Sequence, residues 1–255
     1  MNLVVDLNSD LGEGAGHDKE ILDLVSSANI ACGFHAGDAS SIFATIKAAL
    51  ERNVSLGAHP SFPDRENFGR TEMNLPAEEA YSGVAYQIGA FYALARAAGS
   101  RMNHVKAHGA LYNMAARDRA LADVTVNAVY ALDPKLVLFV PSGSHLDFAA
   151  TELGLATASE VFADRNYLAD GSLVPRSGSR AFVDDPAEAA ERIIRILSEG
   201  KVRAIDGRDV AVSATTICVH GDNPEAVTFV RKLRNRLELE DVVIAAPASA
   251  PRDKF

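Results

Sequence analysis

The chain has 255 residues, of which 48% are hydrophobic and 23% charged, a balance typical of a globular protein and a length typical of one (β/α) barrel. Its formal net charge of −9 argues against general nucleic-acid binding and against adhesion to an anionic membrane, because both need a basic surface. A local basic pocket for an anionic small molecule is still compatible with this charge.

The amino-terminal segment and the cysteine content favour a cytoplasmic protein. No basic stretch followed by an apolar region and a cleavage site opens the chain. No apolar run approaches the roughly 20 residues that a membrane helix needs. The two cysteines, Cys32 and Cys218, provide neither a disulfide framework nor a cysteine-rich zinc motif. We therefore expect a reducing compartment and no membrane contact.

Apolar strands alternate with polar runs and helical patterns along the chain. We predict strands at 3–7, 28–32, 54–58, 103–107, 136–140, 160–163 and 215–219, with helices in most of the gaps, among them 77–98, 186–199 and 224–237. This alternation predicts parallel strands joined by crossover helices, and about seven or eight such units favour a closed TIM-like (β/α) barrel. An Asp206-Gly207 turn predicts a small β-hairpin insertion at 201–212. We predict a single domain, residues 1–255.

Polar residues follow the first two predicted strands. Alternation aims Asp6, Asn8 and Asp10 to one side of the first strand, with Glu13 just beyond. Taken alone, this run fits an acidic turn equally well. After the second strand, His35 lies between two glycines, which suggests close approach of the backbone to a ligand.

The third and fourth strands also lead into polar runs. His59 and Arg70 flank a loop that two prolines stiffen, which favours fixed positions over an ordinary solvated loop. Lys106 and His108 share one face of the fourth strand. A lysine in a strand is costly unless it is paired or binds an anion, so we predict a functional role for it. For His104, a satisfied core histidine is the better prediction.

The later strands add Glu160, Asp164 and Arg165, and then His220 and Asp222 at a predicted helix start, where free N–H groups favour an anion. The carboxyl ends of parallel barrel strands converge on one mouth. Polar runs after at least six strands therefore predict an enzyme active site there.

The sequence contains neither a P-loop for ATP, a nucleophile elbow nor an H-E-x-x-H zinc motif. Asp10, His59 and His108 are candidate ligands for a divalent metal. Because they come from separate strands, their spacing does not decide whether a metal binds.

Several long motifs resemble the LamB/YcsF family in order along the chain, from Asp6 to about Leu237. The matching stretches are 6–13, 29–38, 57–70, 106–113, 160–176 and 219–224. Two positions depart from the family pattern: Ser9 stands where many members have cysteine, and Ala107 where proline is usual.

The resemblance implies a barrel of the glycoside hydrolase and deacetylase type. It also implies cleavage of the lactam of 5-oxoproline to L-glutamate, driven by ATP hydrolysis, by the A component of a 5-oxoprolinase working with partner subunits B and C. ATP is expected to act through those partners, which is compatible with the missing P-loop here.

We hypothesise residue roles for such a lactam-opening site. Asp10 or His59 serves as general base, His108 or Glu160 donates the proton to nitrogen, and Lys106 completes the catalytic set. Lys106, Arg70 and the helix start after His220 hold phosphate or the substrate carboxylate. The predicted substrate-binding residues are Asp6, Asn8, Glu13, His35, Arg70, Asp164, Arg165, His220 and Asp222.

Two alternatives stay open from the sequence. One is a metal-dependent amidohydrolase or deacetylase that needs no ATP, with Asp10, His59 and His108 as ligands. The other is a non-catalytic subunit that binds oxoproline and passes it to its partners. The oligomeric state and a different small lactam as substrate are likewise open.

Overall fold

The structure, a computed structural model, describes residues 3–220 and 225–248. Seven parallel strands form a closed barrel: β1 (Val4–Leu11), β2 (Ser27–Ala31), β3 (Ser55–His59), β4 (His104–Lys106), β5 (Val137–Pro141), β6 (Ala156–Phe162) and β9 (Thr216–Val219). The barrel is closed because β1 pairs with β2 on one side and with β9 on the other. The predicted TIM-like barrel is confirmed, with the lower of the two expected strand numbers.

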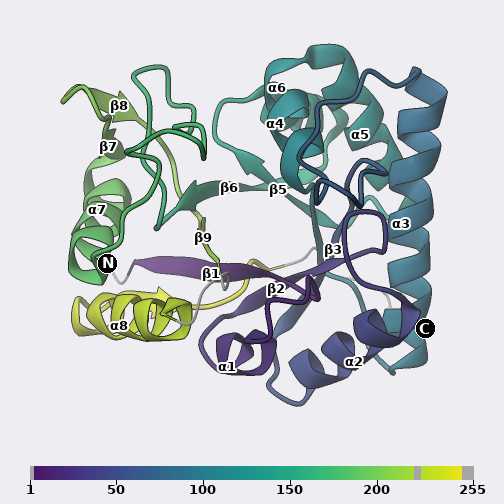
Figure 1. The fold of residues 1–255 in the computed structure, drawn as a ribbon, viewed down its shortest axis with the longest axis horizontal. Helices are drawn as coiled ribbons and strands as arrows, with labels where there is room; N and C mark the ends of the chain where they lie inside the picture. The colour runs from purple at the N-terminus through teal and green to yellow at the C-terminus, as the bar shows by residue number, and fades with distance from the viewer. Residues whose placement is uncertain (1–2, 221–224, 249–255) are drawn as a thin grey trace.

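Helices surround the ring of strands (Figure 1). They are α1 (Asp18–Leu22), α2 (Ala39–Leu50), α3 (Ala77–Ala97), α4 (Gly109–Arg117), α5 (Arg119–Leu132), α6 (His145–Leu153), α7 (Pro186–Glu199) and α8 (Ala226–Leu239). Local sequence sets their ends: Asp38 forms a capping box at the start of α2, and Gly200, with φ of 67°, ends α7. None of the helices in the described ranges is long and apolar enough to cross a membrane.

Two strand boundaries differ from the sequence prediction and both affect the site. β1 continues to Leu11, so Asn8 and Asp10 are strand residues paired with β2 rather than residues of a following loop. β6 begins at Ala156, four residues before the predicted start, so Glu160 lies within this strand and not at its first position. The inward-facing polar side chains of Asn8 and Asp10 are tolerated in β1 because neighbouring strands supply hydrogen-bond partners.

The predicted hairpin insertion is confirmed. β7 (Lys201–Arg203) and β8 (Asp209–Ala211) pair antiparallel beside α7 (Figure 1). A further strand, β10 (Val243–Ile244), pairs with the start of β1 outside the barrel and was not predicted. Two paired residues are too few for a strand to be recognised from the sequence pattern.

Gly57 on β3 gives a stability prediction, because a Cβ atom there would lie 2.1 Å from Nε2 of His104. The imidazole of His104 is fixed: it is buried, stacks on Phe139 and lies 2.8 Å from Oδ1 of Asn29, as expected for a core histidine. We expect Gly57→Ala to lower the free energy of unfolding by roughly 1–3 kcal/mol or more. Thermal unfolding followed by circular dichroism would measure this.

Gly89→Ala is the matched control, because a Cβ at this position of α3 meets no atom within 4 Å. Alanine is the better helix former, so this variant should be unchanged or more stable by up to about 1 kcal/mol. Equal melting temperatures for Gly57→Ala and the wild type would contradict the packing described for His104.

Candidate active site

Lys106 lies at the centre of the barrel mouth, between two carboxylates. Its Nζ is 2.9 Å from Oδ1 of Asp10 and 2.8 Å from Oε1 of Glu160. Sγ of Cys218 is 3.1 Å away on β9. Burial disfavours the ammonium, but the charges of Asp10, Cys218 and Glu160 outweigh it and raise the pKa of Lys106 well above its ordinary value. The lysine is therefore a cation whose charge is already matched.

Hydrogen-bond donors surround the carboxylate of Glu160. Oε1 accepts from Lys106 and from Nδ2 of Asn8 at 3.1 Å, and Oε2 accepts from the hydroxyl of Tyr112 at 2.6 Å. Each of these partners supplies a hydrogen, so the carboxylate needs none of its own. Glu160 therefore holds the ammonium of Lys106 in place. Both of its oxygens accept hydrogen bonds, so it is poorly placed to donate a proton.

Asp10 is the carboxylate that faces the mouth. Its Oδ1 accepts from Nδ2 of Asn29 at 2.8 Å as well as from Lys106, and its Oδ2 lies 3.3 Å from Nε2 of His59. Burial alone would raise its pKa, but the charges of His59 and Lys106 lower the pKa of Asp10 well below its ordinary value. Asp10 is therefore an ionised acceptor at physiological pH.

A histidine cluster lies beside Asp10 and consists of Glu13, His35, His59 and His108. Oε1 of Glu13 is 2.9 Å from Nε2 of His35 and 3.3 Å from Nδ1 of His108. The rings of His35 and His108 stack with centroids 3.9 Å apart. Burial is the main cause that lowers the pKa of both His35 and His108 to about 3. Burial also raises the pKa of Glu13. The two stacked imidazoles are neutral at physiological pH.

His220 and Asp164 form a pair close to Cys218 and Asp10. Nδ1 of His220 lies 2.7 Å from Oδ2 of Asp164. Burial disfavours the imidazolium, but the Asp164 carboxylate outweighs it and raises the pKa of His220 well above its ordinary value. On the other side of the ring, Nε2 lies 3.9 Å from Sγ of Cys218 and 3.2 Å from the guanidinium of Arg176. Arg176 can donate to this nitrogen once His220 has given up its proton.

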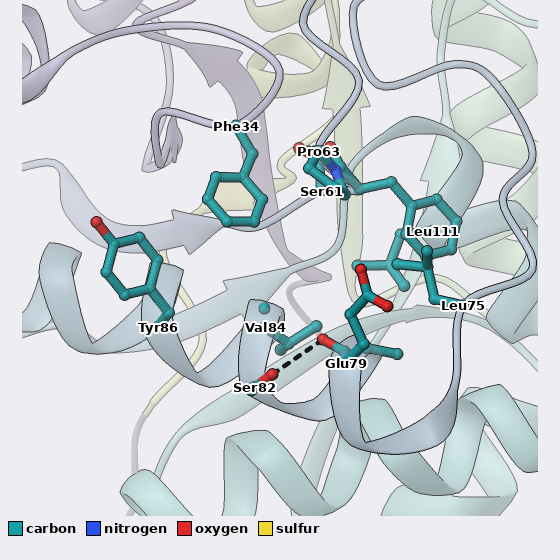
Figure 2. A pocket seen from close by; sticks show the side chains of 12 residues that line it. Phe34, Ser61, Pro63, Leu75, Glu79, Ser82, Val84, Tyr86 and Leu111 are labelled. Carbon is teal, nitrogen blue, oxygen red and sulfur yellow. Dashed lines mark hydrogen bonds between the residues drawn. The ribbon is translucent and has the colours of Figure 1, made fainter.

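Two hollows lie in this part of the surface. One, of about 840 Å³, is lined by Glu13, His35 and Phe68 and so opens onto the histidine cluster. The other, of about 440 Å³, is apolar and lies against α3, with the rings of Phe34 and Tyr86 at one end (Figure 2). None of the predicted site residues lines the apolar hollow, whereas Glu13 and His35 line the first.

The structure brings most of the predicted site residues together. Those that meet at the mouth are Asp10, Glu13, His35, His59, Lys106, His108, Glu160, Asp164 and His220. Asn8 lies beneath Lys106, with Oδ1 3.4 Å from its Nζ. Arg70 is on the exposed loop after β3, with its guanidinium 5.0 Å from the centroid of the Phe68 ring. Asp222 lies outside the described residues.

Two predicted substrate-binding residues, Asp6 and Arg165, already use their side chains in hydrogen bonds within the protein. Asp6 is four residues before Asp10 on β1 and accepts from hydroxyls of Ser26, Ser27 and Thr216 on the barrel floor. Arg165 is buried and donates to backbone carbonyls of the loop that follows β6. These positions favour structural roles over direct contact with a substrate.

Sequence reasoning missed Tyr112 and Arg176. Tyr112 lies four residues after His108, at the spacing that places two residues on one helix face, and this was the signal that could have found it. Nothing in the local pattern marks Arg176, because its contact with His220 joins segments 44 residues apart.

The two departures from the family pattern lie away from the charged groups. The hydroxyl of Ser9 donates to the backbone carbonyl of Val219 at 2.7 Å, and Ala107 packs in the hydrophobic core. Neither side chain is an ionisable partner of Lys106, so neither substitution changes the charged groups of the site.

Comparisons with known proteins agree with this architecture. The model of the LamB/YcsF family matches residues 5–252. A lactam utilization protein from Thermus thermophilus is 47% identical, with a TM-score of 0.90, covering 96% of this chain and 100% of that one. A family 4 carbohydrate esterase from Streptomyces lividans shares the fold at 10% identity and a TM-score of 0.51, covering 95% and 92%. A GH113 β-1,4-mannanase does so at 10% identity and 0.51, covering 93% and 99%. With its whole barrel matched, this chain belongs to the LamB/YcsF family.

Proposed function

We propose that this chain is a hydrolase that opens the lactam ring of 5-oxoproline to give L-glutamate, coupled to ATP hydrolysis, as the barrel component of a 5-oxoprolinase with partner subunits B and C. The observation that carries the proposal is the charged cluster at the mouth, in which Asp10 pairs with Lys106 and the His220–Asp164 pair lies close to the same aspartate. Similarity to a lactam utilization protein supports the substrate class.

A five-membered lactam is an unreactive amide, so its opening near neutral pH needs activation and positioned acid–base groups. In the proposed reaction, ATP phosphorylates the amide oxygen, with the partner subunits supplying the nucleotide site. Water then adds to the ring carbon as a base takes its proton. The C–N bond breaks as an acid protonates nitrogen, which leaves an acyl phosphate. Hydrolysis of that acyl phosphate releases L-glutamate and inorganic phosphate.

Exposure and charge assign the roles. The Asp10 side chain is 10% exposed and that of His220 is 12% exposed, whereas Lys106 is at 3% and Glu160 at 0%. Asp10, ionised and within reach of the mouth, serves as the base. His220, whose pKa is raised, is the better proton donor. Neutral His108 and fully hydrogen-bonded Glu160 are less suited to donate than the sequence suggested. Lys106 is a positioning residue, because its charge is already neutralised.

The proposal is tested by glutamate release from 5-oxoproline with ATP, measured with subunits B and C together and with each one omitted. We expect turnover only in the full mixture, and an Asp10→Asn chain that still assembles with the partners should lose at least about 10³-fold in kcat. Full turnover by assembled Asp10→Asn would make this chain a non-catalytic subunit. Turnover of an amide without ATP would favour the amidohydrolase alternative.

Tyr112→Phe tests the hydrogen bond that Tyr112 donates to Glu160. The variant removes one charge-assisted hydrogen bond to Glu160, a loss of about 1.5–3 kcal/mol in the free energy of unfolding. We expect kcat to fall by about 10-fold with little change in KM, because Tyr112 is buried and does not reach the mouth. Tyr130→Phe, on the exposed face of α5, is the control. Wild-type kcat and stability in Tyr112→Phe would show that Glu160 does not need this donor.

A further inference from the structure

The imidazoles of His59 and His108 bring one ring nitrogen each to within 2.9 Å of the other. Nδ1 of His59 is 2.7 Å from the carbonyl of Lys106, and Nε2 of His108 is 2.9 Å from the carbonyl of Phe68. A carbonyl only accepts, so each of these nitrogens carries the hydrogen. In the neutral rings the other two nitrogens, Nε2 of His59 and Nδ1 of His108, therefore bear lone pairs. They are only 2.9 Å apart.

Further acceptors surround the same point. Nε2 of His59 also lies 3.7 Å from Oε1 of Glu13 and 3.3 Å from Oδ2 of Asp10. The Glu13 oxygen is in turn 3.3 Å from Nδ1 of His108. A second proton on His59 would satisfy one of these contacts, whereas a cation can accept a lone pair from His59, His108 and Glu13 at once.

The distances between these three ligand atoms match the bond lengths of one kind of metal ion. Three atoms that are 2.9, 3.3 and 3.7 Å apart lie on a circle of radius about 1.9 Å, so a point just off their plane is about 2.0–2.1 Å from each. That is the bond length of zinc and similar ions to imidazole nitrogen and carboxylate oxygen. Calcium needs more and longer bonds to oxygen, and magnesium prefers oxygen ligands, so both fit less well.

We propose that Nε2 of His59, Nδ1 of His108 and Oε1 of Glu13 bind one divalent first-row transition-metal ion. Both histidines already donate their other N–H to a backbone carbonyl, which is the arrangement that orients metal-ligating histidines. His35 lies 2.9 Å from the Glu13 oxygen and holds that carboxylate in place. Three protein ligands leave a coordination position for water or substrate, and the hollow lined by Glu13 and His35 gives access to it.

This assignment differs from the ligand set expected from sequence, in which Asp10 took the place of Glu13. Asp10 instead groups with Cys218 and His220 as a second set of possible ligands. That second set already has a cation, because Nζ of Lys106 lies 2.9 Å from Asp10 and 3.1 Å from Cys218. Within the described ranges, no lysine ammonium pairs with Glu13. The histidine cluster is therefore the better metal site of the two.

The test measures bound metal and does not depend on lactam turnover. The purified chain is stripped with a chelator, equilibrated with Zn²⁺ or Co²⁺, passed through a desalting column and analysed for metal content. We expect about one ion per chain, a rise in melting temperature with Zn²⁺, and a visible Co²⁺ spectrum typical of a low-coordinate nitrogen and oxygen site.

Glu13→Gln and His108→Ala should each lower Zn²⁺ affinity by at least about 10-fold, whereas His145→Ala, an exposed histidine at the start of α6, should bind like the wild type. Glu13→Gln retains the size of the side chain, so it separates ligand loss from misfolding if His108→Ala unfolds. Less than about 0.1 ion per wild-type chain at saturating Zn²⁺ would overturn the proposal in favour of a second proton on His59. Equal affinity in all three variants would overturn the ligand set.

Discussion

Lys106→Met should abolish turnover, with kcat reduced by at least about 10³-fold, and should also destabilise the barrel by about 3–5 kcal/mol. The reason is that the ammonium lies between two buried carboxylates, 2.9 Å from Asp10 and 2.8 Å from Glu160. Methionine fills a similar volume but leaves both charges without their cation, and removing one partner of a buried ion pair costs this much. Chemical denaturation and a turnover assay with the partner subunits would measure the two effects.

A second substitution separates the two effects of Lys106→Met. Adding Glu160→Gln removes one of the stranded charges, so the double variant should regain part of the lost stability. Its turnover should stay low, because Asp10 still lacks the ammonium that donates to it and that, together with His59, lowers its pKa. Lys232→Met on the exposed surface of α8 is the control for loss of a lysine. A Lys106→Met chain with normal turnover would show that the charged cluster at the mouth is not used in the reaction.

The barrel could be predicted from the sequence because its strands and helices alternate with different periodicities. Apolar runs found all seven barrel strands, and helical patterns found α3, α7 and α8. The ends of β1 and β6 could not be found this way. Asn8 and Asp10 resemble loop residues until the strands that supply their hydrogen-bond partners are in place, and that is a property of the closed barrel.

The membership of the site was more predictable than the roles within it. Strand ends converge in a parallel barrel, so position along the chain was sufficient to group His59, Lys106 and His220. Roles depend on which partner each group meets. That Lys106 is neutralised by two carboxylates, and that His108 is neutral, follows from burial and contacts between distant segments, which no spacing in the sequence contains. The role of Arg165 could not be predicted either, because its guanidinium donates hydrogen bonds to backbone carbonyls of the loop that follows β6.

Asp164→Asn should move the alkaline limb of the rate profile to lower pH. The Asp164 carboxylate, 2.7 Å from Nδ1 of His220, is the main group that raises the pKa of that histidine against the effect of burial. A histidine with a raised pKa stabilises the fold below its unfolded pKa of about 6.5, and this contribution is lost as the pH rises through the folded value. The proton for the lactam nitrogen is lost over that same higher range.

Without the carboxylate, burial and the guanidinium of Arg176 both disfavour the proton on His220, while the charges of Asp10 and Glu13 favour it. We expect Asp164→Asn to be at least about 10-fold slower at about pH 8 than at about pH 6, whereas the wild type should change little over this range. Recovery at low pH separates loss of the proton from loss of structure. Asp170→Asn, an exposed aspartate on the same loop, should keep the wild-type profile. A uniform loss at every pH in Asp164→Asn would show that the carboxylate only holds the loop, and His220 would then no longer be the proton donor.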